Sequence, residues 1–165
     1  MRLTEDLEHI ARQEKELVLP QFDAEIAWQL GSWLRSVAAK RGLAVVIDVR
    51  RFGQPLFYAA MEGTTPDNVE WVRRKSNVVA RFHRSSYAVG LRETQKGQSI
   101  CESQGLSLAD YATHGGSFPV TVGSVGIVGS ITVSGLPMRE DHELVIEALC
   151  AFLGRNHAEL KLPAE

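Results

Sequence analysis

The chain has 165 residues, of which 44% are hydrophobic and 23% charged, with a formal net charge of −2. This length and composition are typical of a globular protein with one substantial core, so we expect a single domain over residues 1–165. A charge so close to zero argues against a general nucleic-acid-binding protein. No apolar run reaches the roughly 18–20 residues that a membrane-spanning helix needs.

Residues 1–16 are acidic and amphipathic, which does not fit a secretory signal. Cys101 and Cys150 lie far apart and match no zinc or redox spacing. Two reduced thiols are ordinary in the cytosol, so we expect a cytoplasmic protein with no metal site, no nucleic-acid partner and no membrane span.

In chain order, hydrophobic spacing first predicts an N-terminal helical extension within about residues 1–16, with Leu7, Ile10 and Ala11 on one side. A second helix is predicted after the N-cap Asp23 and ends at Gly42, since apolar residues recur at helical spacing between them. The run LAVVIDV, residues 43–49, predicts a buried strand. A turn at residues 53–55 then leads into an antiparallel partner over residues 56–61.

The sequence TTPDN offers a helix N-cap, and the helix that follows includes residues 69–84. A connection containing glycine and serine leads to a short helical piece at residues 108–111. Residues 118–122 and 127–133 predict a second hairpin, and Pro137 precedes a last helix from Glu140 to about Gly154. The order helix, hairpin, helix, hairpin, helix predicts an α+β fold in which an antiparallel β-sheet is flanked by helices.

The stretch WVRRKSNVVARFHR, residues 71–84, is strongly basic in a slightly acidic chain. At about 100° per residue its apolar side chains form one stripe, while Arg74, Asn77, Arg81 and Arg84 share a solvent-facing side. That side is either an ordinary solvated face or a surface for an anion or another subunit. Lys75 falls inside the apolar stripe, so it either snorkels outward or meets an acid or a ligand, and Asp141 is a candidate partner.

Two further segments contain candidate site residues. His114-Gly115-Gly116 precedes a strand, and two glycines let the backbone approach another group closely. Ser134 and Gly135 lie between a strand and a helix whose first turn contains Asp141 and His142. Asp141 and His142 are neighbours on that helix and therefore point in different directions, so their adjacency is weak support for a catalytic dyad. No nucleophile elbow, phosphate loop or zinc-protease motif is present, so the sequence predicts no catalytic residues.

Several segments together resemble the uncharacterised protein family 0303 within the GlcG/HbpS-like superfamily. They are LVLPQFD, VVIDVRRFGQPLFYAAMEGTTPDNVEWVRRK, SSYAVG, YATHGGSFPV and VGSITVSGLPMREDHELVIEAL. The resemblance implies a profilin-like fold. It also implies a homo-oligomer, because superfamily members tend to form dimers or larger rings, and it makes haem a candidate cofactor, because some relatives bind haem. Family haem ligands do not carry over to this sequence, so His114 and His83 are simply the first axial ligands to test.

Three functions stay open from the sequence. The first is a cytosolic, homo-oligomeric protein that binds a small, anionic ligand, with candidate contacts from Arg73, Arg74, Lys75, His114, Gly115, Gly116, Ser134, Gly135 and Asp141. The second is a haem-binding or haem-degrading protein. The third is an adaptor without a ligand, with the basic face and the apolar anchors Trp28 and Trp33 at its contacts.

Overall fold

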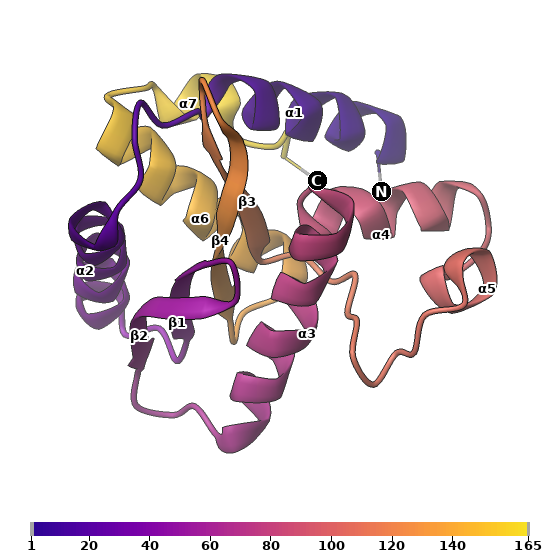
Figure 1. The fold of residues 1–165 in the computed structure, drawn as a ribbon, viewed down its shortest axis with the longest axis horizontal. Coiled ribbons are helices and arrows are strands. Elements are labelled where there is room, and N and C mark those ends of the chain that lie inside the picture. The colour runs from indigo at the N-terminus through magenta and orange to yellow at the C-terminus, as the bar shows by residue number, and fades with distance from the viewer. Residues whose placement is uncertain (1, 165) are drawn as a thin grey trace.

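The structure is a computed structural model that describes residues 2–164, so the ends of the predicted domain, Met1 and Glu165, lie outside the described residues. Figure 1 shows a sheet of two hairpins with helices on both sides. The helices are α1 (Leu3–Glu16), α2 (Ala24–Arg41), α3 (Pro66–Phe82), α4 (Ser86–Gln95), α5 (Ile100–Gln104), α6 (Met138–Leu153) and α7 (His157–Leu160). The strands are β1 (Val46–Arg51), β2 (Gln54–Ala60), β3 (Ser117–Val122) and β4 (Gly126–Ser134).

The four strands pair in the order β2-β1-β4-β3, and every neighbouring pair is antiparallel. Helices α2 and α6 contact one face of this sheet, and α3 contacts the other. The α+β fold that the sequence predicted, an antiparallel sheet flanked by helices, is therefore confirmed. Helix α1, predicted as an N-terminal extension, packs against α4 and α7.

The main core lies on the α2 and α6 side of the sheet. Successive side chains of a strand point to opposite faces, and alternate residues of β1 and β4 on this side are fully buried apolar groups: Ile47, Val49, Ile131 and Val133. They pack with buried leucines of α2 and with Val145 and Leu149 of α6 in one cluster. Burial of such side chains contributes roughly 1.5–3 kcal/mol each, which explains why these elements hold together.

The opposite face of the sheet, under α3, is polar. Its alternate residues are Asp48 of β1 and Ser130, Thr132 and Ser134 of β4, all at most 3% exposed. A buried polar group costs free energy unless it is hydrogen-bonded. In the middle of the face that requirement is met, since Asp48 accepts two hydrogen bonds from Arg50 and the Thr132 and Ser117 hydroxyls lie 2.9 Å apart. The two ends of the face border hollows.

Helix ends follow the predicted caps. The Asp23 side chain accepts a hydrogen bond of 2.8 Å from the Ile26 backbone, and Gly42 ends α2 in the left-handed conformation. Helix α3 begins with Pro66 after a capping box between Thr65 and Asn68. These local signals depend on neighbouring residues alone, which is why the sequence predicts them well.

The connection predicted after α3 is largely helical, and the short helix predicted at residues 108–111 is wrong. Helix α4 occupies much of that connection, with the Ser85 side chain capping it at Ala88. Glycine is a poor helix former, but Gly90 is required by packing, because a Cβ there would lie 2.2 Å from the Thr113 carbonyl oxygen. Residues 108–110 form a turn that arginines of α3 hold by hydrogen bonds to backbone carbonyls.

Candidate functional site

A pocket of about 220 Å³ opens at one end of the polar sheet face, between α3, the HGG segment and the turn from β4 to α6. Nominated residues in its lining are Lys75, His114, Ser134, Gly135 and Asp141. No sequence motif indicated the other lining residues, which are Asn68, Trp71, Leu136 and Met138. Leu136 is adjacent to Gly135, Trp71 and Met138 lie one helical turn from Lys75 and Asp141, and Asn68 lies two turns from Lys75, so helical and turn geometry was the only signal for them.

A buried ion pair forms the floor of this pocket. Lys75 Nζ donates to Asp141 Oδ2 at 2.8 Å and to the Val133 carbonyl oxygen at 3.2 Å, and the two charged side chains are 3% and 2% exposed. Of the alternatives that the sequence left open for Lys75, the structure shows the buried pair, and the candidate partner Asp141 is its acid. Burial lowers the pKa of Lys75 and raises the pKa of Asp141, and the attraction between the two charges opposes both shifts.

Asp141 also holds the turn after β4. Its carboxylate accepts hydrogen bonds from the backbone of Leu136 at 2.9 Å and of Gly135 at 3.4 Å. Backbone donors and an ammonium on one carboxylate are charge-assisted contacts, which are stronger than neutral ones. The first-turn acid of α6 therefore fixes the shape of the pocket rim as well as its floor.

Two hydrogen-bond donors of the pocket have no acceptor among residues 2–164. An ammonium group has three donors, and Lys75 uses two of them. The Ser134 hydroxyl, on a residue that is 3% exposed, makes no hydrogen bond within that range. Both groups border the pocket, so a ligand with an oxygen acceptor can pair with them.

The nominated glycines bring the backbone close to the ion pair. A Cβ at Gly116, whose φ is +130°, would lie 2.8 Å from Lys75 Nζ and 2.3 Å from the Val133 carbonyl oxygen. A Cβ at Gly115 would lie 2.1 Å from the Met138 carbonyl oxygen. Only glycine fits at these two positions, and the HGG segment owes its glycines to this close packing.

His114 stands at the pocket wall. Its exposed ring meets Trp71 edge-on, with ring centroids 4.9 Å apart. Partial burial and then the positive charges of Lys75 and Arg74 lower the pKa of His114, so its imidazole is neutral at pH 7. A neighbouring hollow, of about 180 Å³, shares His114 and Met138 with the pocket.

The structure places Arg73 and Arg74 outside the pocket lining. Arg73 pairs with Glu70 and Asp110, and Arg74 donates to the Leu108 carbonyl oxygen at 2.9 Å. The Arg74 guanidinium also lies 4.6 Å above the Trp71 ring. These arginines therefore hold the loop that leads into His114, instead of reaching the ligand position predicted for them.

The other basic residues of the block divide between contact and exposure. Arg84 pairs with Glu14 of α1 at 2.5 Å, whereas Arg81 is exposed. His83 ends α3 in the left-handed conformation and lines a different hollow, of about 120 Å³. His83 lies about 12 Å along α3 from Lys75, which shares its pocket with His114, so the two haem-ligand candidates His83 and His114 line separate hollows.

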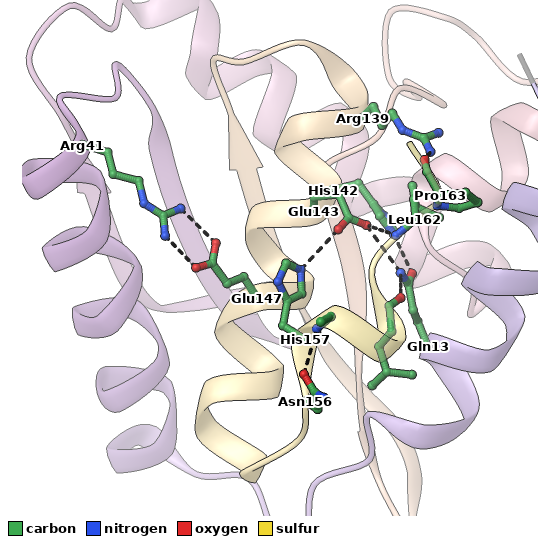
Figure 2. A network of polar contacts seen from close by, with 12 residues as sticks. Gln13, Arg41, Arg139, His142, Glu143, Glu147, Asn156, His157, Leu162 and Pro163 are labelled. Atoms are coloured by element: carbon green, nitrogen blue, oxygen red, sulfur yellow. Dashed lines mark hydrogen bonds and ion pairs between the residues drawn. The ribbon is translucent and has the colours of Figure 1, made fainter. Parts of the chain in front are cut away.

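Asp141 and His142 point apart, as neighbours on a helix do. His142 is fully buried and its Nε2 lies 2.8 Å from Gln13 Oε1 of α1, in the network of Figure 2. Within residues 2–164, the structure has no group of three histidine, cysteine or acidic side chains that could hold a metal ion. Across the same residues, every helix is too short or too polar to cross a bilayer.

The fold and pocket together define an α+β protein with a small polar pocket beside a helix-flanked antiparallel sheet. A family model described as "Haem degrading protein HbpS-like" matches residues 22–150. The chain belongs to this HbpS-like family. Among its relatives, a UPF0303 protein of Acidobacterium capsulatum is 61% identical, with 99% of each chain covered, and one of Paraburkholderia phytofirmans is 57% identical, with 98% of each covered.

Solved structures share the fold. The Ybr137w protein superposes with a TM-score of 0.85 at 28% identity, covering 93% of this chain and 95% of its own. HbpS superposes with a TM-score of 0.64 at 23% identity, over 86% of this chain and 96% of its own. A PduOC:heme complex gives a TM-score of 0.63 at 16% identity, over 81% and 94% of the two chains.

Proposed function

We propose that this protein binds a small anionic molecule in the pocket above the Lys75–Asp141 pair. The observation that carries the proposal is the set of unused donors there, the third ammonium proton of Lys75 and the hydroxyl of Ser134. A carboxylate or carbonyl oxygen of the ligand accepts hydrogen bonds from both groups. The bond to the ammonium is charge-assisted and therefore stronger than a bond between neutral groups.

The rest of the lining suits a ligand with an apolar part. Trp71 and His114 form an aromatic wall, and Leu136 and Met138 contribute apolar surface. Ligand pockets commonly combine a mostly apolar lining with a few placed polar groups. The volume of about 220 Å³ favours a molecule smaller than a drug-sized ligand, for which pockets are about 300 Å³ or larger.

We further propose that the protein is cytoplasmic and homo-oligomeric. Support for a subunit contact comes from Trp28 of α2, which is 59% exposed and meets the Phe57 ring edge-on at 5.6 Å. Tyr58, on the edge strand β2, is 45% exposed. Exposed aromatic residues are enriched in interfaces. Trp33, the other anchor predicted from the sequence, packs against the main core.

Native mass spectrometry of the purified protein tests ligand and assembly together. We expect an oligomer with added small-molecule mass, and we expect Ser134→Ala and Lys75→Met to reduce the retained mass at least fivefold. Arg81→Ala, an exposed change on the same basic helix, should retain it. Circular dichroism shows whether Lys75→Met is folded. If the folded variant keeps the ligand, the pocket assignment is wrong. A defined oligomer with no added mass from any variant would favour the adaptor function.

Haem binding is the second candidate function, and the family description and the PduOC:heme complex favour it. His114 suits an axial ligand, because its ring is exposed and its lowered pKa keeps the imidazole neutral at pH 7. Met138, 38% exposed, and Leu91 provide apolar surface in the neighbouring hollow. A bound haem supplies redox chemistry at its iron, while the part of this chain would be to hold and orient it.

Haemin titration tests that candidate. His114→Ala should weaken haemin binding at least tenfold and shift the Soret band, because an axial bond is lost. His83→Ala tests the second candidate ligand, an exposed histidine at the C-terminal end of α3. A Soret band that survives both substitutions unchanged would exclude these two histidines as ligands.

A further inference from the structure

A second hollow lies at the other end of the polar sheet face. It has a volume of about 120 Å³ and is bounded by the C-terminal end of α3, the β1–β2 turn and the start of β4. Apolar side chains such as Val79 and Val128 form part of its lining, and polar groups come from Arg50 and Ser130. It is separate from the pocket above Lys75, and the inference drawn from it does not depend on the proposed function.

Arg50 lines this hollow and has an unused guanidinium edge. Its Nε and one terminal nitrogen donate to the two oxygens of Asp48 at 2.6 and 2.8 Å. A guanidinium has five donors in a planar fork, so one pair of contacts leaves a second edge with further N–H groups. That edge has no acceptor among residues 2–164. Asp48, which is fully buried, fixes the guanidinium in place.

Ser130 supplies a second unpartnered group. It lies opposite Arg50 in the pairing of β1 with β4, and it is 3% exposed. Its hydroxyl makes no hydrogen bond to any of the described residues, although it lines the hollow. An unpartnered hydroxyl on the residue that pairs with Arg50, together with the unused guanidinium edge, is an arrangement that a ligand with two oxygen acceptors satisfies.

Phe52 forms an apolar rim at an unusual backbone position. It occupies the β1–β2 turn with Gly53, and its φ of +49° is one that bulky residues adopt at a cost. The side chain lines the hollow and yet is 81% exposed. Asparagine followed by glycine is the favoured sequence for a hairpin turn with two positive φ values, so a phenylalanine here does not serve the turn.

We propose that this hollow is a second ligand site, for a small carboxylate with an apolar or aromatic tail. The carboxylate oxygens accept from the free edge of Arg50 and from the Ser130 hydroxyl. The tail packs against Val79 and Val128, and Phe52 covers it. A planar carboxylate matches the fork of a guanidinium, whereas a neutral amide offers one acceptor only.

Titration of the full chain with benzoate, followed by NMR of the labelled backbone amides, tests this site. We expect saturable shifts at residues 76–83 and 127–130. Acetate should bind at least fourfold more weakly than benzoate, since each buried carbon group contributes about fourfold. Benzamide should bind at least tenfold more weakly. Shifts absent from these residues, or phosphate binding as tightly as benzoate, would overturn the proposal.

Three variants test the assignment of groups. Ser130→Ala should weaken benzoate binding at this hollow about fivefold, and Arg50→Lys at least tenfold. Arg35→Lys, which changes an exposed arginine of α2 outside the lining of the hollow, should leave it unchanged. Phe52→Asn should weaken binding about tenfold with an equal or higher melting temperature, because asparagine tolerates this φ. If Phe52→Asn changes the size of the assembly and leaves benzoate binding intact, Phe52 belongs to a subunit contact and the proposed cover is wrong.

Discussion

Replacing Lys75 by alanine is expected to lower the free energy of unfolding by about 3–5 kcal/mol, because the carboxylate of Asp141 is then buried without its counter-charge. The carboxylate keeps the backbone donors of Gly135 and Leu136, but these carry no full charge. Chemical denaturation at pH 7 measures the loss. Lys40→Ala is the control, since Lys40 is exposed on α2 and its removal should cost less than about 0.5 kcal/mol.

The double variant Lys75→Met/Asp141→Asn should recover most of that loss. It removes both charges together and keeps an oxygen at residue 141 for the Leu136 backbone donor, whose hydrogen bond is 2.9 Å. A buried pair replaced as a unit is often close to neutral in stability. A double variant as unstable as Lys75→Ala would mean that shape or packing, and not the unpaired charge, causes the loss.

The pH dependence of the Lys75→Ala variant gives a further check. Burial already raises the pKa of Asp141 in the native protein, and without Lys75 that pKa rises further. The folded state then binds more protons than the unfolded state, so stability falls as pH rises through this window. The deficit of Lys75→Ala should therefore be smaller at pH 5 than at pH 7. A loss below about 1 kcal/mol at pH 7 would contradict a buried pair.

The Lys75–Asp141 pair also marks how far sequence reasoning reaches. Helical spacing alone places Lys75 in an apolar stripe, and the cost of burying an ammonium raises the question of a partner. The choice between an outward-reaching side chain and a pair with Asp141 needed the structure, because Asp141 comes from another helix. The roles of Arg73 and Arg74 did not follow. Both bind the turn at residues 108–110, and no pattern within α3 indicates which loop folds back against it.

The polar face of the sheet could not be predicted from the sequence either. The run from Leu43 to Val49 contains one acid, Asp48, and its partner Arg50 is two residues along the same strand. The sequence therefore predicts a buried strand correctly but not that α3 covers its polar side. The second hollow needs Arg50, Ser130 and Phe52 together, from segments that only the β1–β4 pairing brings side by side.

Acid should destabilise the protein through His142. Burial, and then the charge of Arg139, lower the pKa of His142 to about 3 from the usual 6.5. Between these values the unfolded state binds a proton that the folded state does not, so stability is lost as pH falls. The slope approaches about 1.4 kcal/mol per pH unit, which amounts to about 2 kcal/mol between pH 6.5 and 5.

The hydrogen bonds around His142 explain why it stays neutral. The Gln13 side-chain nitrogen donates to the Leu160 carbonyl oxygen at 2.8 Å, so the Gln13 oxygen faces His142 and Nε2 carries the ring proton. Nδ1 is buried without a partner among the described residues. Protonation there would place a second N–H where nothing accepts it, close to a cation. Figure 2 shows how this network joins α1 and the C-terminal residues to α6.

His142→Gln removes the titrating group and keeps an amide donor for Gln13. Denaturation curves at pH 6.5, 5.75 and 5 should show that this variant loses about 2 kcal/mol less than the native protein over that range, whatever its stability at pH 7. His157→Gln is the matched control, since His157 is a partly exposed histidine of the same network, 3.3 Å from Glu143. If His142→Gln and the native protein lose stability in parallel, His142 is not held as a neutral buried base. Protonation of His142 would then not weaken the contact between α1 and α6.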